Sequence, residues 1–301
     1  MQSNSPDPNR YRTLCELPDV SGVRCWLVQE LKSGQQVVIR DVSTTLFKDG
    51  LRIRFENEAR LLSEIDCDTY NAILSHERFD DRLRLIYPYI EGDSLSTALG
   101  HGALSPESVL ILARDLLQAL VKIHATGCVH RDWRPSHIVM RSHGNAVLAG
   151  YGPVWRANLN AGDSPIGIES VRYASPELAG IIKHDIGPAS DLYSLGLILY
   201  TALSGKAMCD AESVSEILLQ HSTLDLDVDL FPGHTPSQLV SMIERLAQKE
   251  PRERYQSAAA AYADTVAILE WLRGGKRNSP VVIGRSDSRT DLVDPAFVGR
   301  E

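Results

Sequence analysis

The chain has 301 residues, of which 43% are hydrophobic and 23% charged, so it can form one two-lobed domain or two ordinary domains, and wholesale disorder is excluded. Its net charge of −8 argues against a nucleic-acid partner, which would require a basic stripe. The five cysteines are scattered without any C-x-x-C spacing, so they indicate neither a disulfide framework nor a zinc site.

The sequence gives no sign of a membrane segment or an export signal. Its polar beginning, MQSNSPDPNR, lacks the apolar core of a signal peptide. The most apolar run, LYSLGLILYTAL from Leu192, is far shorter than a membrane span. We therefore expect a protein of the cytoplasm, with no membrane partner.

The first part of the chain is predicted to consist mainly of strands. Residues 1–10 are interpreted as a disordered tail, and the segments WLVQEL and QQVVIRDV then have strand patterns separated by a turn at residues 32–34. A hairpin is expected over residues 71–90. One helix interrupts the strands, because the segment RFENEARLLSEI has four apolar residues on one face, namely Phe55, Ala59, Leu62 and Ile65.

Beyond residue 92 the pattern becomes helical. A long helix is expected to start with Ser105 as its N-cap and Pro106 at its first position, and to end at Gly127. A second apolar helix is capped by Ser190 or Asp191 and stops at Gly205. Further helices are predicted around residues 211–220, 236–249 and 256–272. A strand-rich lobe followed by a larger helical lobe is an α+β fold.

The strongest motif is VHRDWRPSHIVM, from Val129 to Met140, directly after the long helix. It resembles the catalytic loop of protein kinases. Further segments match other kinase motifs in order and spacing: VVIR at 37–40, Glu58, IYPYIEGDSL at 86–95, GYG at 150–152, SPE at 175–177, SDLYSLG at 190–196 and PRERY at 251–255. The alternative is an unrelated α+β domain with a chance His-Arg-Asp.

The resemblance implies a kinase-like domain over residues 11–273. Its small lobe would cover 11–87, the hinge 88–92 and the helical lobe 93–273, with a linker over 274–301. The hinge backbone from Pro88 to Ile90 would carry the adenine hydrogen bonds, and Tyr87 would restrict the back pocket.

The resemblance also assigns the catalytic loop. Asp132 stands at the position of the catalytic base, with Arg131 and Arg134 beside it. The alternative is that Asp132 only orders its loop by hydrogen bonds. The loop-anchoring residue would be Asp191, which holds the turn at His130 and Arg131.

Other positions are implied to be structural. Glu177 would pair with Arg254 and brace the helical lobe. Leu62, His130 and Tyr151 fall where the hydrophobic spine of a kinase runs.

The two positions that would hold magnesium are occupied by His137 and Gly150. Magnesium prefers oxygen ligands, whereas glycine has no side chain and imidazole suits softer metals. The nearest downstream acid, Asp163, lies well into the next segment. His137 is therefore either a replacement metal ligand or a structural hydrogen-bonding residue, and magnesium use is not expected.

The phosphate-binding parts are altered as well. Arg40 replaces the expected lysine, and arginine is not interchangeable with lysine, although it can still pair with Glu58. The glycine-rich loop has a single glycine, Gly22, in ELPDVSGVRCW, and Pro18 lacks a backbone N–H. ATP binding is expected to be weak and independent of metal.

These departures favour a degenerate kinase, a pseudokinase that acts as a regulatory module. Losing the metal's charge stabilisation should slow phosphotransfer by several powers of ten. Two alternatives stay open. One is an active serine/threonine kinase that uses an unusual metal or none, and the other is a phosphotransferase of related fold that acts on a small molecule.

The end of the sequence, FVGRE, adds a second resemblance. It is similar to the joint in large signalling proteins in which a kinase-like domain precedes an AAA-type ATPase and histidine-kinase modules. The implied partners are those downstream modules of the same polypeptide. The alternative is an unremarkable tail, and in both cases the segment is expected to be loosely ordered.

Overall fold

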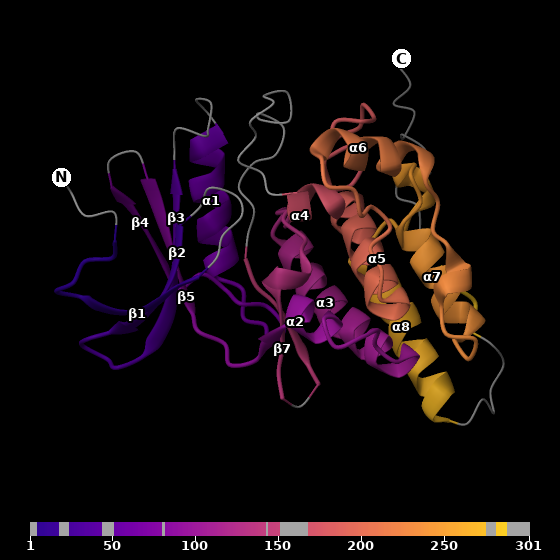
Figure 1. Ribbon diagram of the computed structural model, residues 1–301, viewed down its shortest axis with the longest axis horizontal. Helices are drawn as coiled ribbons and strands as arrows, with labels where there is room; N and C mark the ends of the chain where they lie inside the picture. Colours follow the sequence, from indigo (N-terminus) through magenta and orange to yellow (C-terminus); the bar gives the residue numbers. More distant parts are fainter. Residues whose placement is uncertain are drawn as a thin grey trace, which may run out of the picture.

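The computed structural model describes residues 5–17, 24–43, 51–79, 82–142, 144–150, 168–274 and 281–287. Figure 1 shows a strand-rich lobe beside a helical lobe, with the two joined near α2 and β7. The predicted α+β, two-lobed fold is therefore confirmed. No helix among the described residues is long and apolar enough to cross a membrane.

The small lobe is a five-stranded antiparallel sheet with one long helix. The strand order is β1-β2-β3-β5-β4. The elements in chain order are β1 Tyr11–Leu17, β2 Arg24–Glu30, β3 Gln36–Ser43, α1 Leu51–Ser63, β4 Ser75–Phe79 and β5 Arg82–Pro88. Alternating residues of β3 point to opposite faces, because the side-chain period of a strand is two. One face packs in a cluster with Trp26, and the other carries Arg40.

The helical lobe is built around two apolar helices, α3 and α5. Its elements are β6 Asp93–Ser94, α2 Leu95–Leu99, α3 Pro106–Ala125, η2 Pro135–His137, β7 Ile138–Met140, β8 Ala146–Leu148, α4 Ile168–Arg172, α5 Pro188–Ser204, α6 Val214–Thr223, η3 Val228–Leu230, α7 Ser237–Leu246, η4 Pro251–Glu253 and α8 Ala258–Arg273. As predicted, α3 starts with Ser105 as N-cap, whose hydroxyl accepts a hydrogen bond from the Ser108 N–H, and Pro106 follows.

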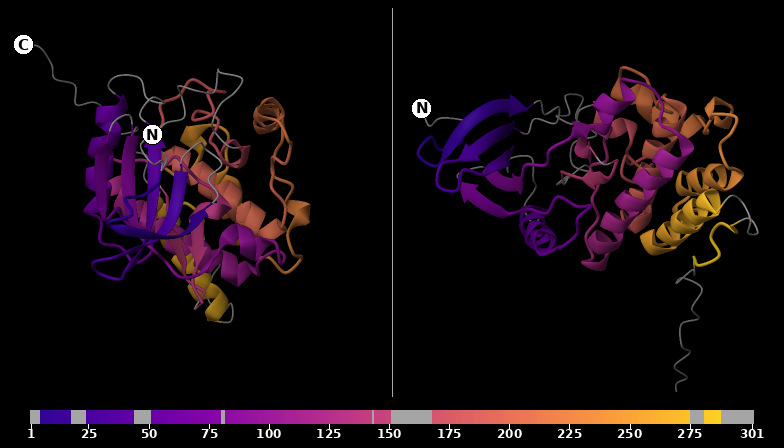
Figure 2. Two further views of the ribbon diagram at one scale, coloured as in Figure 1. Left: turned by 60° about the vertical axis from the view of Figure 1, so that its left-hand side comes forward. Right: turned by 90° about the horizontal axis from the view of Figure 1, so that it is seen from below.

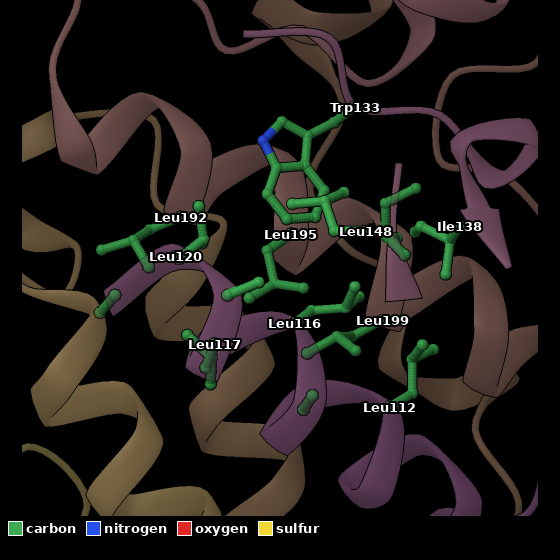
Figure 3. Close-up of a cluster of buried hydrophobic side chains, with 14 of the residues drawn as sticks. Leu112, Leu116, Leu117, Leu120, Trp133, Ile138, Leu148, Leu192, Leu195 and Leu199 are labelled. Atoms are coloured by element: carbon green, nitrogen blue, oxygen red, sulfur yellow. The ribbon is translucent and has the colours of Figure 1, made fainter. Parts of the chain in front are cut away.

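Leucines from α3 and α5 interdigitate in the core beneath the catalytic loop. Figure 3 shows Leu116 and Leu120 of α3 close to Leu195 and Leu199 of α5, with the indole of Trp133 above them. These side chains are buried, and the same apolar cluster extends to Leu62 of α1. Burial of a leucine stabilises the fold by about 1.5–3 kcal/mol. The catalytic loop therefore rests on a packed apolar platform.

Residues 281–287, expected from the sequence to be loosely ordered, pack against the helical lobe. Val281 and Ile283 contact its apolar core. The Gly284 N–H donates to the Asp264 carboxylate at 2.6 Å, and Arg245 pairs with Asp287 at 2.6 Å. The Asp287 side chain is fully buried. We call residues 281–287 the docked segment. The sequence did not indicate this packing, because the segment has no apolar period of its own.

We predict that Gly284→Ala lowers the melting temperature. Gly284 has a φ of 76°, which a side chain disfavours, and an added Cβ would lie 1.8 Å from the Arg245 guanidinium. Backbone strain and the disturbance of the pair between Arg245 and the buried Asp287 should together cost roughly 1–3 kcal/mol. Thermal denaturation checks this, with Gly233→Ala as control because nothing lies within 4 Å of a Cβ there. Equal melting temperatures for the two variants would contradict the docking.

Candidate functional site

The turn at the start of the catalytic loop is held by the carboxylate of Asp191, on the first turn of α5. It accepts hydrogen bonds from the backbone N–H groups of His130, at 2.8 Å, and Arg131, at 2.9 Å. The Trp133 indole and the His124 ring each donate to it at 2.9 Å. Burial opposes ionisation of Asp191, but these donors outweigh it and lower its pKa.

Arg131 has a left-handed backbone, with φ at 66°, which is uncommon for a residue with a side chain. The bond from its N–H to Asp191 offsets that strain. His130 is completely buried beside it, and its Nε2–H donates to the carbonyl of Gly150. Burial lowers the pKa of His130, so its ring is neutral at physiological pH. The turn thus connects α5 to the chain at residue 150.

Asp132, the expected base, is buried and contacted by three side chains. Arg134 donates to one carboxylate oxygen at 3.1 Å, and Nδ1 of His137 lies 3.3 Å from that same oxygen. Ser170 donates to the other oxygen at 3.3 Å. Burial opposes ionisation, yet Arg134 and the other nearby cations lower the pKa of Asp132 below its usual range. The carboxylate is therefore ionised, and its pKa makes it a weak base.

His137 packs directly against Gly150. Its Nδ1–H donates to the Asp132 carbonyl at 3.2 Å. A Cβ placed on Gly150, whose φ is 76°, would lie 2.7 Å from that nitrogen and 3.0 Å from two ring carbons. Burial lowers the pKa of His137 to about 3, so the ring is neutral. The imidazole fills the volume that a side chain at 150 would enter.

These residues do not fit a magnesium ion. Gly150 offers no side-chain oxygen, and His137 is a nitrogen donor already engaged with Asp132. No group of three or more His, Cys, Asp or Glu within the described ranges is arranged to hold a metal. Of the three described residues at this site, Asp132, His137 and Gly150, only Asp132 offers a carboxylate, and it is paired with Arg134.

Arg40 and Tyr87 are both buried on the small-lobe side of the candidate site. Arg40 is only 6% exposed and influences the pKa values of Asp132, His137 and Tyr87, so it lies near all three. Burial raises the pKa of Tyr87 to about 12, and Arg40 opposes part of that shift. Pro88 and Ile90 follow as the half-buried connection to the helical lobe. Arg40 therefore adds a second guanidinium near Asp132, beside that of Arg134.

The predicted pairing of Glu58 with Arg40 is corrected by the structure. The Glu58 carboxylate instead accepts two hydrogen bonds from Arg131, at 2.8 and 2.9 Å, and one from Arg54 at 2.8 Å. The side chains of Glu58 and Arg131 are each 9% exposed. Because Glu58 belongs to α1 and Arg131 to the catalytic loop, this bidentate pair joins the two lobes. We call it the lobe-bridging pair.

The bracing pair of the helical lobe is present. Arg254 contacts Glu177 through both terminal nitrogens, at 2.7 and 3.0 Å, and both side chains are fully buried. Leu62 and His130 are also buried completely. The predicted spine member Tyr151, the loop positions Pro18 and Gly22, and Asp163 lie outside the described residues.

One functional contact was missed by sequence reasoning. Ser170, at the start of the segment leading to SPE, donates to Asp132 from a completely different part of the chain. Its neighbour Glu169 accepts a 2.9 Å hydrogen bond from Ser136 of the catalytic loop. The one feature of the sequence that could have indicated this contact is the position of Ser170, five residues before the SPE motif. The two contacts dock α4 onto the catalytic loop.

Comparison with known proteins identifies the family. The model of the protein kinase domain matches residues 21–265, so the chain belongs to the protein kinase family. It is 29% identical to the serine/threonine-protein kinase pkn2 of Myxococcus xanthus over 83% of this chain and 31% of that protein. It is 26% identical to the serine/threonine-protein kinase PrkC of Bacillus subtilis over 85% of this chain and 40% of that protein.

A third relative is the serine/threonine-protein kinase PknL of Mycobacterium tuberculosis. It is 30% identical over 73% of this chain and 55% of that protein. The chain thus spans between about a third and just over half of these relatives.

We predict that Glu58→Ala destabilises the protein by about 3 kcal/mol, because it removes the two charge-assisted hydrogen bonds that hold the buried Arg131. Chemical denaturation measures the loss. The control is Glu64→Ala on the same helix, whose exposed pair with Arg60 is worth only about 0.3–0.5 kcal/mol. If both variants lose the same stability, the lobe-bridging pair has no special role.

Proposed function

We propose that this chain is a pseudokinase domain, a kinase fold that regulates by binding and conformational relay rather than by metal-dependent phosphotransfer. The observation that carries this proposal is the contact between His137 and Gly150, which leaves no space for a side-chain oxygen at residue 150, so that of the three described residues Asp132, His137 and Gly150 only Asp132 offers a carboxylate. Phosphotransfer depends on charge neutralisation by metal ions bridging the phosphates. The site is instead neutralised by arginines.

The lobe-bridging pair supports the relay part of the proposal. The side chains of Glu58 in α1 and Arg131 in the catalytic loop join the two lobes directly, so a change in one lobe can be passed to the other. The partners of such a relay would be further modules of the same polypeptide in the cytoplasm, an AAA-type ATPase followed by histidine-kinase modules. The resemblance of the FVGRE terminus supports this part.

Nucleotide would bind weakly and without metal. The phosphates would face Arg40, whose guanidinium lies near Asp132 and whose charge attracts anions with no divalent ion present. The backbone of residues 88–90 would hold adenine, since main-chain groups do not depend on side-chain identity.

We expect ATP to raise the melting temperature by the same small amount with Mg²⁺, with Mn²⁺ and with EDTA. Ligand binding to the folded state stabilises it in proportion to occupancy. Differential scanning fluorimetry over an ATP titration makes the measurement. A shift of the melting temperature that occurs only with Mg²⁺ would contradict the proposal.

A second candidate function, an active serine/threonine kinase with atypical or no metal use, is favoured by the surroundings of Asp132. The base is present and is oriented by Arg134 and Ser170. Transfer of the γ-phosphate from radiolabelled ATP to a generic basic protein, lost in Asp132→Asn, would support this function over the first.

We predict that Gly150→Asp alone destabilises the fold, because its Cβ meets the His137 ring and its backbone is left-handed. Combining it with His137→Asn should recover part of that loss and create Mg²⁺-dependent stabilisation by ATP. The single variant His137→Asn is the matched control. Equal stability for Gly150→Asp with and without the second change would contradict the steric coupling.

A further inference from the structure

A groove of about 1180 Å³ runs along the hinge. Three segments and one residue of α2 line it: residues 63–74 at and after the end of α1, the hinge residues 88–93, the turn at 140–142 between β7 and β8, and Ala98. In Figure 1 these elements meet where the two lobes join. Neither Asp132, His137 nor Arg40 lines it. The groove is therefore separate from the catalytic-loop site.

The walls of the groove are fixed by backbone pairing. The Asn71 N–H donates to the Leu148 carbonyl at 2.9 Å, and the Leu148 N–H donates to the Thr69 carbonyl at 2.9 Å. The Asn71 side chain then reaches the hinge, where Nδ2 donates to the Pro88 carbonyl at 3.2 Å. The groove is thus a preformed feature of the junction.

Four exposed carboxylates stand along the groove, and none forms an ion pair with any described residue: Asp66, Asp68, Glu91 and Asp93. The one cation among the lining residues is Arg141. Like charges that share one groove repel each other, and a cationic ligand would relieve this repulsion. The carboxylates are too dispersed to hold a metal ion, since no such cluster occurs among the described residues.

Apolar side chains lie between these charges. Leu74 and Tyr89 line the groove and are 56% and 41% exposed, although both are large and hydrophobic. Ile65, Ile90 and Met140 add to the same surface. Such a patch rimmed by charges is typical of an interaction site.

A buried acceptor in the groove wall gives an independent indication of a ligand. Asn71 lines the groove and is 7% exposed, and its Oδ1 has no hydrogen-bond partner within the described residues. A buried polar atom without a partner is costly and uncommon. An N–H donor of a bound ligand would satisfy it.

We propose that the hinge groove is a docking site for an extended peptide segment of a partner protein, in which lysine or arginine alternates with apolar residues. The cations would meet the four carboxylates, the apolar side chains would cover Leu74 and Tyr89, and a peptide N–H would reach Asn71. The groove exceeds the roughly 300–1000 Å³ of usual small-molecule pockets. The groove shares the hinge residues 88–90 with the proposed adenine site, but none of the side chains that would meet the peptide, those of the four carboxylates, Leu74, Tyr89 and Asn71, is assigned to nucleotide binding.

The test uses the full chain and two fluorescein-labelled peptides, measured by fluorescence anisotropy at low salt. In the first peptide leucine alternates with arginine, and in the second every arginine is replaced by glutamate. We expect the arginine peptide alone to bind, and its affinity to fall as salt is added, because exposed charges are screened.

The variant combines Asp66→Asn, Asp68→Asn, Glu91→Gln and Asp93→Asn. Each exposed ion pair changes affinity by up to about fivefold, so the combined variant should bind at least ~10-fold more weakly. The control neutralises four exposed carboxylates elsewhere: Glu16→Gln, Asp185→Asn, Glu212→Gln and Asp229→Asn. It has the same net charge and should retain binding.

A second variant, Leu74→Ser with Tyr89→Ser, removes apolar surface without changing charge and should also weaken binding at least ~10-fold. Unchanged melting temperatures exclude unfolding as the cause. Equal binding to the groove variant and the control, binding of the glutamate peptide, or no binding to the unaltered chain would each overturn the proposal.

Discussion

The arrangement of the candidate site depends on one buried carboxylate, Asp191. Its four donors come from α3 and from three residues of the catalytic loop, so it joins two parts of the chain that are about 60 residues apart. Without this acceptor the left-handed backbone of Arg131 would lose its compensating bond, and the N–H groups of His130 and Arg131 would lose their partner. Asp191 therefore fixes the turn from which the side chains of Arg131 and Trp133 extend.

The lobe-bridging pair is the first consequence of that turn. With its backbone fixed by Asp191, Arg131 extends toward α1 and meets Glu58 in a bidentate pair, the strongest geometry for such ions. Arg134, three residues on, turns to Asp132. Glu58 and Asp132 are thus both compensated by arginines of the catalytic loop, and the lobe-bridging pair connects the two lobes.

The fold and the bracing contacts could be predicted from the sequence, whereas the partner choice of Glu58 could not. The pair of Glu177 and Arg254 depends on residues whose positions the motifs fix. Three arginines are candidate partners of Glu58, namely Arg40, Arg54 and Arg131. Which of them it contacts depends on the rotation of α1 about its axis and on the backbone conformation of the catalytic loop. The sequence pattern predicts neither the rotation of the helix nor the conformation of the loop.

Two other features could not be predicted from the sequence, for a different reason. The contact of Ser170 with Asp132 joins residues 38 positions apart through a segment without periodicity. The docked segment is held by Asp264, Arg245 and Asp287, which are single polar residues without a recurring spacing. Hydrophobic patterns predict elements well because they repeat. Individual polar contacts do not repeat, and only their geometry reveals them.

The changes at residues 137 and 150 are physically coupled. A carboxylate at 150 without a bound cation would stand near Asp132 in a buried cleft, where two like charges repel strongly and one of them would have to take up a proton. Glycine avoids that repulsion but leaves space, and dense packing requires the space to be filled. The neutral ring of His137 fills it and donates to the Asp132 carbonyl. The ring of His137 thus occupies the space beside Gly150, and the Asp132 carboxylate is paired with the guanidinium of Arg134.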